Sequence, residues 1–183
     1  MLDKKNLRTQ IQQQRNALST KAITQAALNI KQKIITHPNI KNAKKIGAYL
    51  ACNNELDLGP SIEALLEMGK EIFIPILHPV HNTFWFAPWQ NNFKKNKFGI
   101  EEPVYKCSEL LAPWDLDIAL VPLIAADHAG HRIGMGKGYY DRSFAFKKFT
   151  EKPILIGCSY AFQIQKKLPQ EDFDILMDEI IHL

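Results

Sequence analysis

The sequence predicts a three-layer α/β fold in which a mostly parallel sheet has helices on both faces. Short apolar runs of strand length alternate along the chain with longer segments whose apolar residues recur at helical spacing. This alternation is typical of parallel sheets, because a helix usually connects one parallel strand to the next. A glycine-rich segment also follows one apolar run directly, in the position where α/β sheets bind their ligands.

Two helices are predicted at the beginning of the chain. Residues 3–18 form the first, whose apolar side consists of Leu7, Ile11 and Leu18. Ser19 and Thr20 interrupt the periodicity and supply an N-cap for the second helix, which is expected to end before Pro38. The apolar residues at helical spacing in the second helix are Ala22, Ile23, Ala26, Ala27, Ile30 and Ile34.

The rest of the chain supplies the strands and the remaining helices. Apolar, β-branched and aromatic runs predict strands at 46–51, 71–77, 83–89, 117–123, 154–160 and, as an edge strand, 178–183. Helices are predicted at 60–68, closed by Gly69, and at 139–148. No repeat, linker or low-complexity stretch interrupts the sequence, so residues 1–183 are expected to form a single domain.

Composition limits the classes of function. The 23 basic and 19 acidic residues give a net charge of +4, which suits an anionic small ligand and is too small to indicate nucleic-acid binding. The cysteines Cys52, Cys107 and Cys158 are widely spaced, which favours reduced thiols over a disulfide framework or a zinc site. Because no signal segment or membrane-spanning run is present, we expect a cytoplasmic protein with no membrane partner.

Residues 130–142 carry the strongest indication of function. Glycines alternate at Gly134, Gly136 and Gly138, and Lys137 lies between the last two. A backbone without Cβ atoms can approach a ligand closely, its N–H groups can converge on an anion, and the lysine adds a full positive charge. The predicted helix that follows would point its N-terminus at a bound phosphate. With Asp141 close by as an oxygen ligand, the segment indicates a nucleotide phosphate site with a metal ligand attached.

Two common phosphate-binding motifs do not fit this segment. A P-loop would need a glycine where His131 stands and a hydroxyl residue where Gly138 stands. The dinucleotide fingerprint needs its third glycine one residue further along the chain. A flexible glycine turn is the plain alternative, but the lysine, the two tyrosines and the aspartate make it much less favoured.

The longer segment from Val121 to Arg142 contains the following pattern: Val121, Pro122, Asp127, Gly130, Arg132, Ile133, Gly134, Gly136, Gly138, Tyr139, Tyr140 and Asp141. This pattern resembles the signature of the 5-formyltetrahydrofolate cyclo-ligase family, also called methenyltetrahydrofolate synthetases. The family usually has an aromatic residue where this chain has Ala126. The resemblance covers the whole chain, through Lys4-x-x-Leu7-Arg8, Glu55 and Phe98-Gly99-Ile100-x-x-Pro103.

The resemblance implies a three-layer α/β fold and an ATP- and Mg²⁺-dependent conversion of 5-formyltetrahydrofolate to 5,10-methenyltetrahydrofolate. Lys137 and Arg132 would be the catalytic residues and would neutralise phosphate charge, and Asp141 and Asp174 would hold Mg²⁺. The implied ATP-binding residues are Lys4, Arg8, Arg132, Gly134, Met135, Gly136, Lys137, Gly138, Tyr139 and Tyr140. The expected folate-binding residues are Leu50, Glu55, Trp89, Met135, Gly136, Lys137, Gly138 and Tyr139.

Two of these assignments have ordinary structural alternatives. Trp89 belongs to an aromatic cluster with Phe84, Trp85 and Phe86, for which core packing is the usual role. On the first helix, a basic stripe of Lys4, Arg8 and Arg15 borders the apolar stripe, where stems can pack while the charged ends reach solvent or a cleft. The resemblance assigns Lys4 and Arg8 to ATP, and Arg15 is a weaker third ligand.

Two other classes of function remain open on the sequence alone. One is an ATP-using enzyme that acts on a different small molecule. The other is an RNA-binding module, suggested only by the pI of about 8.9 and the basic first helix. We favour the folate enzyme, with ATP and 5-formyltetrahydrofolate as its partners, and we expect a monomer that binds no nucleic acid.

Overall fold

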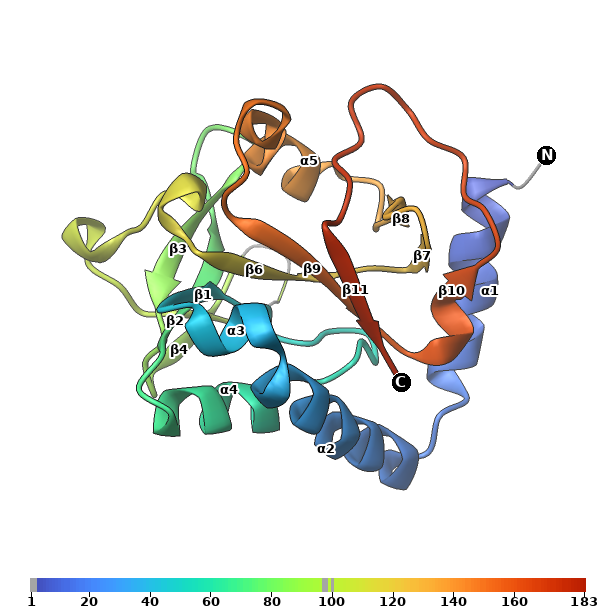
Figure 1. The fold of residues 1–183 in the computed structure, drawn as a ribbon, viewed down its shortest axis with the longest axis horizontal. Coiled ribbons are helices and arrows are strands. Elements are labelled where there is room, and N and C mark those ends of the chain that lie inside the picture. Colours follow the sequence, from blue (N-terminus) through green and yellow to red (C-terminus); the bar gives the residue numbers. More distant parts are fainter. Residues whose placement is uncertain (1–2, 97–98, 100) are drawn as a thin grey trace.

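The computed structural model of the protein describes residues 3–96, 99 and 101–183 (Figure 1). Its centre is a six-stranded sheet with the order β11-β9-β6-β1-β2-β3. The pair β2–β3 is antiparallel, and the other neighbouring pairs of this sheet are parallel. The mostly parallel α/β fold predicted from the sequence is therefore confirmed. The strands are β1 (Lys45–Gly47), β2 (Glu71–Leu77), β3 (Phe84–Pro88), β6 (Ile118–Pro122), β9 (Ile154–Ser159) and β11 (Glu179–His182).

Helices α2 (Thr20–Thr36), α3 (Pro38–Asn42) and α4 (Gly59–Glu67) cover one face of this sheet, below it in Figure 1. The α2 helix begins where the sequence predicts, because the Ser19 side chain accepts a hydrogen bond from the backbone N–H of Ala22. The apolar stripes of the helices meet the branched side chains of the strands in a fully buried cluster that includes Ile30, Ile34, Ile62, Leu65, Ile46 and Ile156. The short α3 is not predicted from the sequence.

The opposite face of the sheet has a thinner covering. The predicted helix 139–148 is divided into α5 (Tyr139–Ser143) and the 3-10 turn η3 (Ala145–Phe149), because Phe144 leaves the helical conformation at φ −108°. Buried Phe144 packs there against the sheet residues Phe86 and Val121 and against Met177. The second helical layer is therefore short and is completed by the chain that leads into β11.

The first helix, α1 (Lys4–Asn16), packs beside a second sheet instead of on the central one (Figure 1). This small sheet has the order β10-β7-β8 and contains β7 (Ala125–Asp127), β8 (Arg132–Ile133) and β10 (Ile164–Gln165). Leu7 and Ile11 of α1 are buried against Ile124, Ile133 and Leu168. The strands β7 and β8 form a hairpin that leads directly into the glycine segment.

Buried Asp127 fixes this hairpin. Its carboxylate accepts hydrogen bonds from the backbone N–H groups of Ala129, His131 and Leu168, at 2.9–3.1 Å, and lies 2.9 Å from the His131 ring. Burial alone would raise the pKa of Asp127, but these hydrogen bonds lower it below its ordinary value. Asp127 is therefore a structural anchor for the loop that follows.

Several other elements differ from the sequence prediction. The strand expected at 46–51 stops at Gly47, and the chain then turns through Asn53 and Asn54, both at positive φ. A hairpin of β4 (Phe93–Lys95) and β5 (Glu101–Pro103) and three further 3-10 turns were not predicted: η1 (Cys107–Glu109), η2 (Pro113–Asp115) and η4 (Ala161–Gln163). Phe98 and Ile100, from the family-like segment, lie outside the described residues. Within the described part of the chain, no helix is long and apolar enough to cross a membrane.

Candidate active site

A cavity of about 760 Å³ opens at the carboxyl ends of β1, β2 and β6. Its walls also include α1, the glycine segment, the β4–β5 hairpin and the 171–174 segment. A volume of this size is typical of pockets that bind small molecules. The predicted site residues in its lining are Lys4, Arg8, Leu50, Glu55, Arg132, Gly134, Met135, Gly136, Lys137, Gly138, Tyr139, Tyr140, Asp141 and Asp174.

The glycine loop (Gly134–Gly138) owes its shape to two residues in the left-handed region. Gly136 has φ 88° and Gly138 has φ 63°. A Cβ atom on Gly138 would lie 2.8 Å from Nη1 of Arg142, so a side chain there would both strain the backbone and displace a neighbour. Arg142 in turn donates a hydrogen bond to the carbonyl oxygen of Lys137, which holds the loop closed on itself.

A side chain of α1 holds the other end of this loop. Nε of Arg8 donates a hydrogen bond of 2.8 Å to the carbonyl oxygen of Gly134. The helix predicted after the loop begins at Tyr139, but α5 is only five residues long, so its dipole adds little positive potential at the loop. The positive charge comes instead from the side chains of Arg8, Lys137 and Arg132, all of which line the cavity.

Arg132 and Asp141 form a nearly buried ion pair at the base of the loop. Nη2 of Arg132 lies 2.6 Å from Oδ1 of Asp141, and the two side chains are 5% and 19% exposed. The same oxygen accepts a hydrogen bond from the backbone N–H of Ile175, while the guanidinium lies over the ring of Tyr140. Nε of Arg132 is buried without a hydrogen-bond partner among the described residues.

Asp174 lies next to α1 and directly precedes Ile175, whose backbone N–H bonds Asp141. Nζ of Lys4 is 3.5 Å from Oδ2 of Asp174 and 3.4 Å from a carboxylate oxygen of Glu171. No group of three histidine, cysteine or acidic side chains that could hold a metal occurs among the described residues. Asp141 and Asp174 fit Mg²⁺ only as two ligands beside phosphate oxygens and water, which is the usual coordination of this ion.

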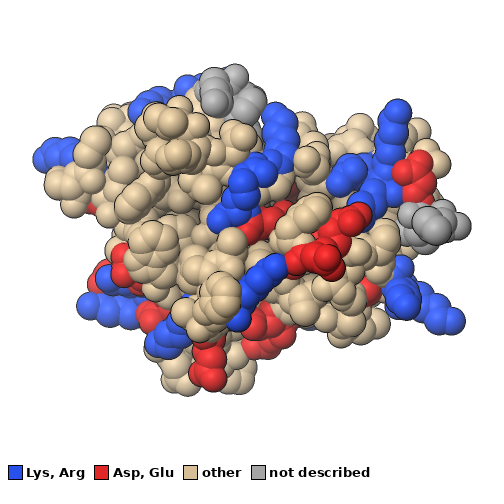
Figure 2. All heavy atoms as spheres, turned by 90° about the horizontal axis from the view of Figure 1, so that it is seen from above, with Lys and Arg blue, Asp and Glu red and all other residues tan. Residues whose placement is uncertain are grey.

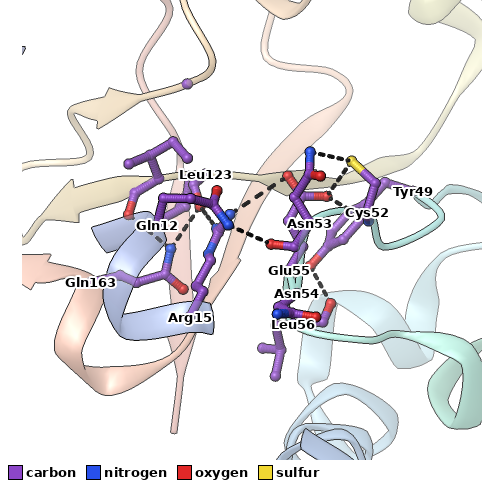
Figure 3. Close-up of polar contacts among 12 residues, drawn as sticks. Gln12, Arg15, Tyr49, Cys52, Asn53, Asn54, Glu55, Leu56, Leu123 and Gln163 are labelled. Carbon is purple, nitrogen blue, oxygen red and sulfur yellow. Dashed lines mark hydrogen bonds and ion pairs between the residues drawn. The ribbon is translucent and has the colours of Figure 1, made fainter. Parts of the chain in front are cut away.

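Glu55 also lines the cavity, and Figure 3 shows its polar contacts with Arg15 and Cys52. Its Oε2 accepts hydrogen bonds from the backbone N–H of Cys52, at 3.2 Å, and from Sγ of the same residue, at 3.5 Å. Burial raises the pKa of Glu55, and the contacts with Cys52 and Arg15 oppose that shift. Burial and the neighbouring carboxylate raise the pKa of Cys52 to about 12, so this thiol stays protonated and is no nucleophile.

Trp89, like the weaker candidate Arg15, does not belong to the described lining of the cavity. The strand β3 runs antiparallel to β2, so Phe84 pairs with Leu77 at the carboxyl end of β2 while Trp89 bonds Ile72 at the other end. Trp89 packs edge-on against Phe93 instead. Phe84 takes the aromatic position at the cavity, with its ring centroid 5.3 Å from that of Tyr139.

Other cavity residues were missed by the sequence prediction. Tyr49, Cys52 and Phe173 line the cavity, and Phe173 is exposed at its rim. Phe84 could have been selected from the aromatic cluster if the antiparallel direction of β3 had been known. Arg15, by contrast, is buried and does not appear among the described lining residues, so it lies apart from Lys4 and Arg8.

Charges of both signs lie close together on the face of the molecule seen in Figure 2. Basic side chains there alternate with acidic ones and do not form one continuous basic surface. The cavity lining also carries both signs of charge. The basic residues Arg8, Arg132 and Lys137 belong to or contact the glycine segment, and the lining includes the carboxylates Glu55, Glu101, Asp141, Glu171 and Asp174. The fold and this cavity together define the class of protein: an α/β enzyme with a site for an anionic ligand at the carboxyl ends of its parallel strands.

Comparison with known proteins gives the particular family. The model of the 5-formyltetrahydrofolate cyclo-ligase family matches residues 1–182. The chain is 30% identical to the 5-formyltetrahydrofolate cyclo-ligase of Escherichia coli K12, over 93% of this chain and 95% of that protein. The chain therefore belongs to the 5-formyltetrahydrofolate cyclo-ligase family, a family of ligases.

Solved structures agree with this assignment. The 5,10-methenyltetrahydrofolate synthetase of Aquifex aeolicus superposes with a TM-score of 0.82 at 30% identity, covering 98% of this chain and 89% of that one. The corresponding enzyme of Mycoplasma pneumoniae gives a TM-score of 0.77 at 27% identity, covering 98% of each chain.

Proposed function

We propose that this protein closes the ring of 5-formyltetrahydrofolate to 5,10-methenyltetrahydrofolate and hydrolyses ATP to ADP and phosphate in doing so. The observation that carries the proposal is the shared cavity. Its lining includes both the glycine loop with Lys137 and Arg132 and the Glu55 carboxylate. A phosphate donor and a ring with N–H donors can therefore be held in the same space.

The reaction needs an activated formyl group. The formyl oxygen attacks the γ-phosphorus of ATP, the bond from that phosphorus to the β–γ bridging oxygen breaks, and ADP leaves. The resulting iminium phosphate carries a carbon that the second folate nitrogen can attack. Phosphate then departs with the former formyl oxygen, the attacking nitrogen loses its proton, and the methenyl bridge is complete.

The residues of this chain position the substrates and neutralise charge, and they form no covalent bond. Lys137, Arg132 and the loop N–H groups of 134–138 face the transferring phosphoryl group, where negative charge is greatest. Arg8 and Lys4 bind the rest of the nucleotide from α1. Asp141 and Asp174 would hold Mg²⁺, which supplies further neutralisation of phosphate charge when bound.

The folate side depends on Glu55. A carboxylate can accept two parallel hydrogen bonds from the neighbouring N–H donors of a pterin ring, and Leu50 lies beside it in the cavity wall. Phe84 and Tyr139 supply aromatic surface for the flat rings. We further propose that the protein acts as a cytoplasmic monomer without a nucleic-acid partner.

An absorbance assay for the methenyl product tests the proposal directly. Purified protein should form that product from 5-formyltetrahydrofolate only when ATP and Mg²⁺ are both present. Glu55→Gln should weaken the binding of folate far more than that of ATP. The NH2 group of glutamine is a hydrogen-bond donor, and it would meet the N–H donors of the pterin ring. Absence of product, together with ATP hydrolysis on another member of a substrate panel, would favour an ATP-using enzyme of different specificity.

A further inference from the structure

Arg15 is an arginine in the interior of the protein, near the end of α1. Only 1% of the residue is exposed, and Nη2 donates a hydrogen bond to the carbonyl oxygen of Leu123. Nε and Nη1 are buried without a hydrogen-bond partner among the described residues. A guanidinium with two unpartnered nitrogens is costly to bury, so packing alone gives no reason for a charge at this position.

The unpartnered side of the guanidinium faces Glu55 (Figure 3). Nη1 of Arg15 lies 3.9 Å from Oε1 of Glu55, and the two side chains are 2% and 9% exposed. The second carboxylate oxygen, Oε2, is fixed by Cys52. One oxygen of Glu55 is thus hydrogen-bonded to Cys52 and the other lies near the Arg15 charge, while Glu55 also lines the cavity.

The position of Arg15 is itself fixed by its hydrogen bond to the Leu123 carbonyl, which Gln163 also binds. Nε2 of Gln163 donates to the carbonyl oxygen of Leu123 at 2.7 Å and to that of Ile124 at 2.8 Å. Arg15 and Gln163 therefore share the Leu123 carbonyl, one residue after the end of β6. This arrangement joins the carboxylate wall of the cavity to the segment that leads into the glycine loop.

Electrostatics explains why a charge is needed there. Burial favours the neutral form of Glu55, which would present a proton where the carboxylate should accept one. The titratable and charged groups that face Glu55 from the surrounding elements are Arg15 of α1, Tyr49 and Cys52 of its own segment, Tyr140 of α5 and Tyr160 after β9. Of these groups, only Arg15 carries a positive charge at neutral pH.

We propose that Arg15 is a positioning residue that keeps the Glu55 carboxylate ionised and aimed into the cavity, so that it can accept the N–H donors of the folate ring. This inference rests on the proposed function for the identity of the ligand. It assigns Arg15 to the folate side of the site, and to a role without direct contact with either substrate.

The variants Arg15→Met and Arg15→Lys separate charge from packing. Methionine keeps an unbranched apolar stem without charge, whereas lysine keeps the charge. Calorimetric titration should show that Arg15→Met binds 5-formyltetrahydrofolate more weakly than wild type, by about tenfold for each pH unit by which the solution lies below the pKa of Glu55 in that variant. The loss should shrink as the pH rises, because Glu55 then ionises without help. Binding of a non-hydrolysable ATP analogue should stay within about twofold of wild type, and Arg15→Lys should recover most of the folate affinity.

Glu55→Gln provides the matched control. Its folate binding should be weak at every pH, and adding Arg15→Met to it should cause no further loss, because the group on which Arg15 acts is gone. Equal loss of both ligands in Arg15→Met at all pH values, or a further loss in the double variant, would overturn the proposal and make Arg15 a packing residue. If Arg15→Met does not fold, Arg15→Lys decides the question, since an intact charge must preserve folate binding.

A carboxyl ¹³C NMR titration of the free protein keeps this inference separate from the proposed function. The Glu55 signal, assigned by comparison with Glu55→Gln, should titrate at higher pH in Arg15→Met than in wild type. An unchanged titration of Glu55 would refute the role of Arg15 whatever the substrate is. If the titration moves but the wild-type protein does not bind 5-formyltetrahydrofolate, the proposed function fails and the effect of Arg15 on Glu55 stands.

Discussion

Replacing Asp141 by asparagine tests the ion pair at the base of the glycine loop. The amide can still accept a hydrogen bond, but it leaves Arg132 without a counter-charge. This matters because the Arg132 side chain is only 5% exposed. Charge-assisted hydrogen bonds contribute about 1.5–3 kcal/mol and neutral ones about 0.5–1.5 kcal/mol, so the weakened bond alone costs about 1–1.5 kcal/mol. The unneutralised guanidinium adds to this, although water reaches Asp141 and limits the addition. We expect a total loss of about 2 kcal/mol in the free energy of unfolding.

Urea denaturation followed by tryptophan fluorescence measures this loss. Thermal unfolding should show the same change as a decrease of about 4–8 °C in Tm for a chain of this size. Asp174→Asn is the matched control, because Asp174 lies in the same cavity but forms its ion pair with the more exposed Lys4. Its hydrogen bond from the backbone N–H of Glu171 can be kept by an amide oxygen. That variant should lose about 0.5 kcal/mol or less.

The same two variants distinguish a structural aspartate from a metal ligand. If both carboxylates hold Mg²⁺, each variant should need more Mg²⁺ for half-maximal rate, although only Asp141→Asn is destabilised. Equal unfolding free energies for the two variants would refute the structural role of the Arg132 pair. Unchanged Mg²⁺ requirements would leave the metal to phosphate oxygens and water.

Three further predictions concern the loop and its anchor. Lys137→Ala should lower kcat/KM by about a hundred- to a thousandfold without altering the melting temperature, because one preorganised charge is lost from an exposed side chain; wild-type turnover in steady-state kinetics would exclude the assignment. Gly136→Ala and Gly69→Ala both place an alanine at positive φ and should each cost about 1–2 kcal/mol in denaturant titrations, but only the first should weaken ATP binding. The pKa of Asp127 is lower in the folded protein than in the unfolded chain, where it is about 3.9. The ionised carboxylate therefore stabilises the fold at pH values above about 3.9, and this stabilisation is lost as the pH falls through the lower pKa of the folded protein. Asp127→Asn should therefore be less stable than wild type near pH 6, and the difference between the two should shrink in acid unfolding below about pH 4.

The periodicity of the sequence was enough to predict the central sheet. The strands at 71–77 and 154–160 agree with the structure almost residue for residue, because long apolar runs bounded by polar residues have few alternative conformations. The β7–β8 hairpin could not be predicted in the same way. Its strands are three and two residues long, and they are fixed by the Asp127 side chain and by contacts with α1 and β10 that no local pattern contains.

The candidate site was predicted mainly through its motif. The sequence did not show which end of the aromatic run faces the cavity, or how deeply Arg15 is buried. The aromatic run 84–89 contains a residue at each end of β3, and only the antiparallel pairing with β2 decides that Phe84 faces the cavity and Trp89 does not. Arg15 lies on the same helical stripe as Arg8. Its burial depends on the packing of α1 against the segment after β6, where it bonds the Leu123 carbonyl, and this tertiary contact has no signal in residue spacing.

The docking of α1 has a consequence for the order in which the molecule is completed. The contacts of this helix with the site join residues 126 and 167 positions apart, through Arg8 to Gly134 and Lys4 to Glu171. During synthesis α1 leaves the ribosome first, but its apolar residues Leu7 and Ile11 have no core to pack against until Ile124, Ile133 and Leu168 have emerged. By contrast, α2, β1, α4 and β2 can assemble among themselves. The nucleotide side of the cavity is therefore assembled last, and a nascent or truncated chain that lacks its C-terminal part would carry a folded sheet core without a working phosphate site.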